Sequence, residues 1–229
     1  MAGDPDGQGG PHVLVSDVEH PEVGDDDRHH LERVLRLRPG DPLTIGDGRG
    51  RWRPARHGAE LTDLGEVVAV AAPLVELTVG VALVKGSRPE LAVQKLTEIG
   101  IDRIALFVAE RSVVRWDDDK VAAQRQRLAR VAREAVMQCR RTWLPDLEIL
   151  ADLRRLATTP GMAMADFDGG PVTAAHHGVL IGPEGGWTDA ERQLAGARVR
   201  LGRHVQRAET AAISAGVLLA AQRDTTTNR

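Results

Sequence analysis

The 229 residues carry a formal net charge of -3, with 42% hydrophobic and 28% charged side chains, which is ordinary for a soluble globular protein and excludes one that is basic overall. No apolar run approaches the roughly 20 residues that a membrane-spanning helix needs, so no membrane partner is expected. The single cysteine, Cys139, excludes an internal disulfide, and the adjacent histidine pairs lack metal-ligand spacing; we therefore expect no metal and a cytoplasmic location.

The chain begins with the polar, glycine-rich letters "MAGDPDGQGG", which predict a disordered tail over 1–11. Short strand-like runs punctuated by turns follow over 12–72: "HVLVS", "DPLTIGDGRGRWRPA" and "GEVVAVA". The "GDGRG" letters indicate a hairpin, because its turn needs residues that tolerate positive φ. Between the first two strands, "DDDRHHLERVLRLRPGD" indicates a short helix that ends at Pro39 and Gly40. We interpret 12–72 as a small β-barrel domain.

Strands alternate with helices over 73–229, a pattern typical of an α/β domain around a mostly parallel sheet. Strands are expected at 75–84, 102–110, 161–168, 178–182 and 197–202. A helix is expected over 85–100, where Ser87 and Glu90 have capping-box spacing and Gly100 is a stop signal. Two more helices, one long and amphipathic and one apolar almost all round, are expected at 119–141 and 209–222.

The stretch "VLIGPEGGWTDAE", 179–191, joins the end of a buried strand to a helix start through a glycine-rich loop. Three glycines allow a close backbone approach, so main-chain groups can contact a planar heterocycle without side-chain bulk. Thr188 and Glu191 have capping-box spacing, which predicts a helix directly after the loop. The alternative is a tight turn whose glycines serve chain reversal only. The sequence of this segment matches neither the dinucleotide-binding fingerprint nor a Walker A loop.

A second strand end, glycine and helix start occurs in "LGRHVQRAETAAISA", 201–215. Loops at the carboxyl ends of neighbouring parallel strands form the ligand crevice of an α/β sheet, so we expect the two loops to meet. Arg207, Glu209 and Thr210 would then face the ligand. In the alternative interpretation, Glu209 and Thr210 only start a helix and Arg207 is a surface charge.

With both loops in place, the chain resembles the RsmE family of bacterial ribosomal RNA methyltransferases. The resemblance is carried, in order, by "HHLERVLRLRPGD", "KGSRPELAVQKLTEIGIDRIALFVAERSV", "REAVMQCRRTWLP", "LIGPEGGWTDAE" and "LGRHVQRAETA". It implies a PUA-like, RNA-binding β-barrel over 12–72 and a SPOUT methyltransferase domain with a trefoil knot over 73–229, working as a homodimer. It also implies methyl transfer from S-adenosyl-L-methionine to N3 of a uridine in the 16S rRNA of the small ribosomal subunit.

The resemblance also implies site residues. The expected cofactor-binding residues are Ile181, Gly182, Pro183, Glu184, Gly185, Gly186, Leu201, Gly202, Val205, Arg207, Glu209, Thr210 and Ala211. The chain departs from the family pattern at His204 and Gln206, where an arginine and a leucine are usual. Arg207 is the expected catalytic residue, stabilising charge on the uracil, and Glu209 is either a base or a helix cap.

Arginines of the segments that carry the resemblance are suited to RNA phosphates, although each could equally be an ion-pair partner. They are Arg88, Arg111, Arg115, Arg140 and Arg141. Two other functions stay open. The domain could methylate another RNA base or a transfer RNA, or the chain could be a non-catalytic PUA-type RNA-binding or ribosome-assembly protein with a degenerate pocket.

Overall fold

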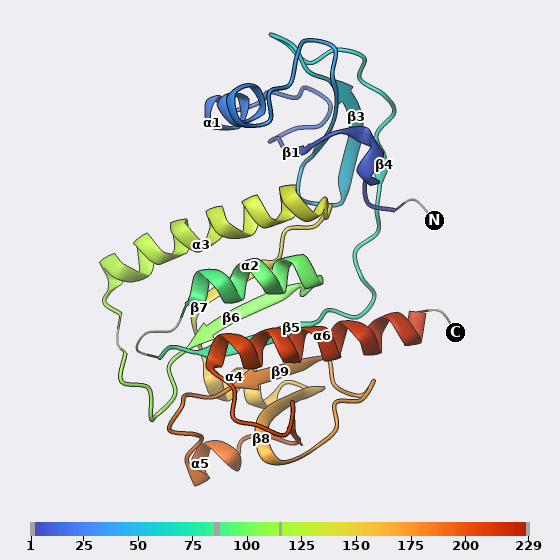
Figure 1. The fold of residues 1–229 in the computed structure, drawn as a ribbon. Coiled ribbons are helices and arrows are strands. Elements are labelled where there is room, and N and C mark those ends of the chain that lie inside the picture. Colours follow the sequence, from blue (N-terminus) through green and yellow to red (C-terminus); the bar gives the residue numbers. More distant parts are fainter. Residues whose placement is uncertain (1–2, 85–87, 115, 228–229) are drawn as a thin grey trace. The chain divides into compact units, whose positions relative to one another are not determined.

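The computed structural model describes residues 3–84, 88–114 and 116–227, which group into two compact units (Figure 1). The first unit combines Met1–Pro73 with Arg133–Leu144, and the second combines Leu74–Ala132 with Pro145–Arg229. The long helix α3, Asp118–Cys139, therefore contributes residues to both units. No helix of the described residues is both long enough and apolar enough to cross a bilayer.

The first unit contains a four-stranded sheet with the strand order β1-β2-β3-β4. Its elements are η1 (Gly7–Gly9), β1 (His12–Leu14), α1 (Asp25–His29), η2 (His30–Val34), β2 (Pro42–Gly46), β3 (Arg51–Arg56) and β4 (Val68–Ala69). β1 pairs with β2 in parallel, and the other pairs are antiparallel. The hairpin expected at "GDGRG" joins β2 to β3, and Asp47 Oδ1 accepts hydrogen bonds from the Arg49 and Arg51 backbone N–H groups. The barrel is not formed by the described strands, because β1 and β4 remain edge strands.

The described residues of the tail over 1–11, for which the sequence predicts disorder, form hydrogen bonds with residues far along the chain. Asp4 Oδ1 accepts hydrogen bonds from the Thr142 N–H at 3.0 Å and the Thr142 hydroxyl at 2.6 Å. Arg140 donates to the carbonyl oxygens of Gly10 and Asp6. These long-range contacts are among those that group 133–144, expected in the second domain, with the first unit.

His12 is a buried titratable side chain in the first unit, 3% exposed. Its Nδ1 lies 2.9 Å from Thr44 Oγ1, and its Nε2 is buried with no hydrogen-bond partner among the described residues. Burial, as the main cause, and the positive charge of Arg140 together lower the pKa of His12 from 6.5 to about 4, although the negative charge of Asp4 opposes them. The folded unit therefore holds a neutral imidazole.

We expect this burial to make the first unit sensitive to acid. The unfolded chain binds a proton at His12 more readily than the folded chain, so stability is complete above pH 6.5 and is lost as the pH falls toward 4. The loss should reach about 2 to 3 kcal/mol near pH 4.5. Urea unfolding at pH 7 and 4.5 measures it. His12→Asn should reduce the pH dependence, whereas His20→Asn, at an exposed position, should not.

The second unit is built on a six-stranded sheet with the order β10-β8-β9-β5-β6-β7, in which all five neighbouring pairs are parallel. The strands are β5 (Thr78–Ala82), β6 (Arg103–Phe107), β7 (Asp146–Ala151), β8 (Met162–Gly170), β9 (Gly178–Ile181) and β10 (Arg198–Val199). The parallel α/β sheet predicted from the sequence is thus confirmed. β7 and the helix that follows it were not predicted.

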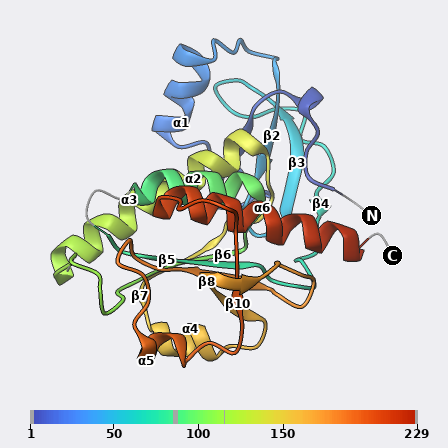
Figure 2. The same ribbon diagram turned by 60° about the horizontal axis from the view of Figure 1, so that its bottom comes forward.

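Helices cover both faces of this sheet (Figure 2). They are α2 (Pro89–Ile99), α4 (Leu153–Thr158), α5 (Asp189–Arg192) and α6 (Ala208–Thr227). α2 and α6 lie together on one face, and α4 and α5 lie on the other. As expected, Gly100 ends α2 in the left-handed region, with φ 96°. Ser87 lies outside the described residues, and Arg88 is the N-cap of α2.

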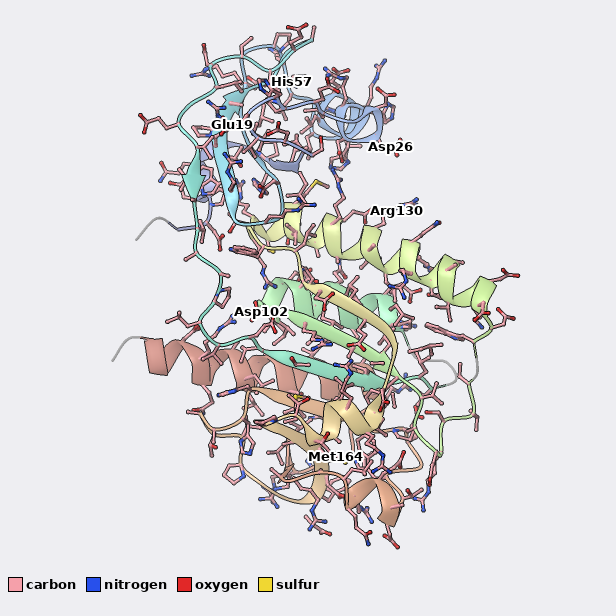
Figure 3. All side chains as sticks on the ribbon, turned by 180° about the vertical axis from the view of Figure 1, so that it is seen from behind. Glu19, Asp26, His57, Asp102, Arg130 and Met164 are labelled. Carbon is pink, nitrogen blue, oxygen red and sulfur yellow. The ribbon has the colours of Figure 1, made fainter. Side chains whose placement is uncertain are left out.

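Both faces of the sheet carry an apolar core. Leu96, Val179 and Leu219 belong to the core under α2 and α6, whereas Met164 and Trp187 belong to the core on the opposite face. Asp102 and Met164, which come from these two regions, are labelled in Figure 3. Asp102 Oδ2 accepts hydrogen bonds from the Leu77 N–H at 2.9 Å and from Arg223 Nη1 at 2.6 Å, and thereby fastens α6 to the start of β5.

Strand order places the two glycine loops at one edge of the sheet. β8 pairs with β9 on one side and with β10 on the other. Because all three strands run in parallel, the segments that leave the carboxyl ends of β9 and β10 emerge on either side of β8. These segments are 182–188 and 200–207.

Candidate functional site

A cavity of about 210 Å³ lies where the two glycine loops meet. It is lined by Ala165, Asp166, Phe167, Ile181, Gly182, Pro183, Glu184, Gly186, Trp187, Arg192, Arg200, Leu201, Gly202, His204, Val205, Gln206, Ala208 and Ala211. The residues come from β8, from the end of β9, from both loops, from Arg192 of α5 and from the start of α6. The two loops that the sequence singles out therefore share one cavity. No cluster of three or more metal-ligating side chains occurs among the described residues.

The three loop glycines have different reasons for lacking a side chain. A Cβ added at Gly182 would lie 2.8 Å from Cε2 of Trp187, closer than real Cβ contacts allow. Gly186 has φ 69°, which favours glycine, and its N–H donates to the Pro183 carbonyl at 2.8 Å to close a turn. At Gly185 a Cβ would meet Arg111 at an ordinary 3.4 Å.

Trp187 is the rigid wall behind the loop. Only 2% of this residue is exposed, and its ring stacks on Phe107 with a centroid distance of 6.0 Å. Its Nε1 donates to the Ala165 carbonyl at 3.0 Å. Because stacking, burial and a hydrogen bond hold the Trp187 side chain, it cannot shift easily to make room for a Cβ at position 182.

Glu191 is a buried carboxylate that fastens the far end of the loop. The predicted capping box is confirmed, because the Thr188 hydroxyl accepts from the Glu191 N–H while Glu191 Oε2 accepts from the Thr188 N–H at 2.9 Å. Its other oxygen, Oε1, accepts from the Glu110 N–H at 2.8 Å. One side chain thus joins the glycine loop to the segment that follows β6.

Arg111 makes a second connection between the same two segments. Its Nη1 donates to the Gly185 carbonyl at 2.6 Å. An arginine expected to contact RNA is therefore engaged with the protein backbone.

The second loop is fixed through its main chain at one end. The Arg200 N–H donates to the Gly170 carbonyl at 2.7 Å, next to the point where β10 pairs with β8. Gln206 lines the cavity, and its Oε1 atom is buried with no hydrogen-bond partner among the described residues. Buried acceptors in folded proteins are usually paired, so Gln206 Oε1 calls for a donor that the described residues do not supply.

An ion pair forms part of the cavity wall. Arg192 Nε donates to Asp166 Oδ2 at 2.9 Å, and the Asp166 side chain is 8% exposed. Burial keeps this pair less screened by salt than a surface pair. The ion pair thus places fixed polar groups in a cavity lining that is otherwise largely apolar.

Most residues expected to hold a cofactor come together in this cavity. Ile181, Gly182, Pro183, Glu184, Gly186, Leu201, Gly202, Val205 and Ala211 are part of its lining. The lining described here does not include Gly185, Arg207, Glu209 or Thr210. Arg207 is exposed, and its carbonyl accepts the Ala211 N–H at 2.8 Å, which makes it part of the start of α6.

Sequence reasoning missed the contribution of β8. Ala165, Asp166 and Phe167 line the cavity because β8 lies between β9 and β10. The order of strands in a sheet cannot be read from a local sequence pattern, so the sequence did not indicate that these residues line the cavity. Trp187 did carry one, because a large aromatic residue directly after two glycines is a candidate wall for the loop.

The remaining arginines expected at RNA are dispersed. Arg140 bonds to two backbone carbonyls in the first unit, and Arg141 has interactions of its own. Arg88 is exposed at the N-cap of α2, and Arg115 lies outside the described residues. Arg133 of α3 forms an ion pair with Asp27 at 2.6 Å.

Comparison with known proteins identifies relatives of both parts of the chain. Residues 71–220 match the model of an RNA methyltransferase domain family, and residues 23–62 match that of an RNA methyltransferase PUA domain. The ribosomal RNA small subunit methyltransferase E of Mycobacterium bovis is 34% identical over 217 residues, which cover 83% of this chain and 82% of that protein.

Two solved structures share the fold. A probable rRNA methyltransferase from Porphyromonas gingivalis superposes with a TM-score of 0.78 at 28% identity, covering 94% of this chain and 99% of that one. A methyltransferase from Legionella pneumophila, solved with its cofactor SAM bound, has a TM-score of 0.77 at 24% identity and covers 92% of this chain and 96% of that one. At that identity, the second likeness describes the fold.

Proposed function

Because this chain belongs to the RNA methyltransferase family that includes ribosomal RNA small subunit methyltransferase E, we propose that it methylates N3 of a uridine in 16S rRNA, with S-adenosyl-L-methionine as donor. The observation that carries the proposal is the single cavity formed where the two glycine loops meet. Its lining combines glycine-rich loops with a largely apolar surface and a few polar groups, which suits a folded nucleoside.

The residues present fit such a cofactor. Gly182 keeps the space in front of Trp187 open, so main-chain groups of the loop can contact adenine. Gln206 Oε1 is an unused buried acceptor, and the cofactor has hydroxyl and amino donors to offer it. The loop residues that line the cavity would hold the cofactor, with Arg207, Glu209 and Thr210 next to them on the same chain segment; they are Ile181, Gly182, Pro183, Glu184, Gly186, Leu201, Gly202, Val205 and Ala211.

Bound S-adenosyl-L-methionine supplies an activated methyl group on a sulfonium, so the protein needs neither a metal nor a covalent intermediate. The acceptor nitrogen of uracil carries a proton at neutral pH and must lose it as the bond to carbon forms. A positioned guanidinium stabilises the charge that develops on the uracil oxygens. Arg207 is our candidate for this role, and Glu209 for the base that accepts the proton.

Arg207→Ala should leave the cofactor dissociation constant unchanged and lower kcat about tenfold. We expect only this modest decrease in kcat because water screens the charge of an exposed guanidinium. Single-turnover methylation and calorimetry measure the two quantities separately. Unchanged turnover would remove Arg207 from the mechanism, and Arg207→Lys should recover part of the loss.

The family resemblance supports three further features. We infer a SPOUT trefoil knot in the second unit, supported by the return of the chain from edge strand β10 to α6, which packs against β5 and β9. We infer a homodimer, supported by exposed apolar residues at the cavity and on α6: Phe167 at 55%, Val205 at 83% and Val217 at 51%. We infer a PUA-like RNA-binding role for the first unit and a cytoplasmic site of action.

Mapping of 16S rRNA by mass spectrometry, in a strain that lacks this protein, tests the acceptor. Loss of one uridine N3 methyl group, restored by the wild-type gene, is the expected result. An rRNA with unchanged methylation would reject this acceptor and favour another RNA base. Calorimetry with S-adenosyl-L-methionine separates an enzyme from a non-catalytic RNA-binding module, because a degenerate pocket would bind none.

A further inference from the structure

Four arginines occur within ten residues of the second loop and its preceding strand. They are Arg198, Arg200, Arg203 and Arg207, and all four are exposed. No acidic residue occurs between them. This is a dense local positive charge on a chain whose formal net charge is -3.

These arginines lack the carboxylate partners that several other arginines of the second unit have. Arg192 pairs with Asp166, Arg223 with Asp102 and Arg127 with Glu90. Within the described residues, no ion pair involves any of the four arginines of 198–207. Keeping like charges together without compensation costs folding energy, so such a cluster is typical of a surface that meets an anionic partner.

Their position relates them to the cavity. Arg200 is part of the cavity lining, and its backbone is fixed by the hydrogen bond to Gly170. Arg203 follows Gly202 and precedes His204, which are both lining residues. An RNA strand that delivers a base into this cavity must bring its phosphates past the same loop, because a base to be modified is splayed out of its strand.

We propose that Arg200 and Arg203 bind the RNA phosphates that flank the target nucleotide. The inference rests on the proposed function and deepens it, because it assigns the RNA contact at the cavity to the β10–α6 loop. Arg111 and Arg140, expected in this role from the sequence, already donate to backbone carbonyls. Phosphate contacts of this type position the strand and make its binding depend on salt.

The experiment uses the full chain and unmodified small ribosomal subunits from a strain that lacks the protein. Arg200→Gln and Arg203→Gln should each raise KM about fivefold to tenfold. Each should also reduce the slope of log affinity against log salt by about 0.7, the value for one lost contact to a single strand. Arg154→Gln is the matched control, because Arg154 is exposed on α4 and absent from the described lining.

Cofactor calorimetry and sedimentation complete the test. Arg203→Gln should keep the cofactor dissociation constant and the oligomeric state of the wild type. If Arg200→Gln and Arg203→Gln have the same KM and salt slope as Arg154→Gln, the inference is overturned. It is also overturned if their oligomeric state changes while the salt slope does not, because the loop would then form a contact between subunits. If the wild type binds the subunits without methylating them, the proposed function fails, and the salt slopes still decide the arginine contacts.

Discussion

Gly182→Ala should raise the dissociation constant for S-adenosyl-L-methionine about tenfold to a hundredfold. The new methyl carbon would lie 2.8 Å from Cε2 of Trp187, and that indole is buried, stacked on Phe107 and hydrogen-bonded to Ala165. The loop backbone must therefore move away from the indole. Overpacking of this kind costs about 1 to 3 kcal/mol. If that cost lowers the binding free energy of the cofactor, it corresponds to the expected rise in the dissociation constant. Isothermal calorimetry measures the constant directly.

Other glycines provide a graded control series. Gly186→Ala should have an intermediate effect, because its φ of 69° strains any residue with a side chain. Gly185→Ala and Gly196→Ala should bind as the wild type does, because the first meets only ordinary contacts and the second meets nothing within 4 Å. Trp187→Phe removes the ring atoms that clash, so it should recover part of the affinity lost in Gly182→Ala. Equal constants for all four glycine variants would refute the steric explanation.

Glu191→Ala should lower the free energy of unfolding by about 2 to 4 kcal/mol and weaken cofactor binding as well. The change removes the acceptor for two backbone N–H groups, those of Glu110 and Thr188, in a residue that is only 4% exposed. It also releases the glycine loop from the segment after β6. Urea unfolding followed by circular dichroism measures the stability, and calorimetry measures the affinity.

Variants of the same capping box separate its two halves. Thr188→Ala should cost about 1 kcal/mol, because it removes one cap and leaves the Glu191 contact to Glu110 in place. Thr188→Ser keeps the hydroxyl and should be close to the wild type. Glu134→Ala, at an exposed position of α3, controls for the loss of a carboxylate. A Glu191→Ala protein as stable as Glu134→Ala would contradict the proposed anchoring role.

The elements that the sequence predicted well are those whose signal is local. The glycine loop, the Thr188–Glu191 capping box and the Gly100 stop depend on residues close together in the chain, and the structure has all three. β7 was missed because its letters "DLEILA" include two acidic residues, which are uncommon in strands. Its alternation is also broken by Leu150, which has φ 57°, next to a register shift.

Features that depend on distant contacts were not predictable in the same way. The tail is polar and glycine-rich, and nothing in its local sequence indicates that Asp4 bonds to Thr142, far along the chain. Arginines at 111 and 140 have the chemistry for phosphate, and their hydrogen bonds to the backbone carbonyls of Gly185 and Asp6 could not be read from the sequence. The contribution of β8 to the cavity depends on strand order, which a single sequence does not encode locally.

Trp187 gives the protein a built-in optical reporter. Its indole forms part of the cavity wall and is almost fully shielded from water, so the polarity around it depends on what occupies the space beside Gly182. Ligand entry should therefore change the intensity or wavelength of its emission. A titration of the unlabelled wild-type chain, compared with Trp187→Phe to subtract the three other tryptophans, can then follow occupancy in real time.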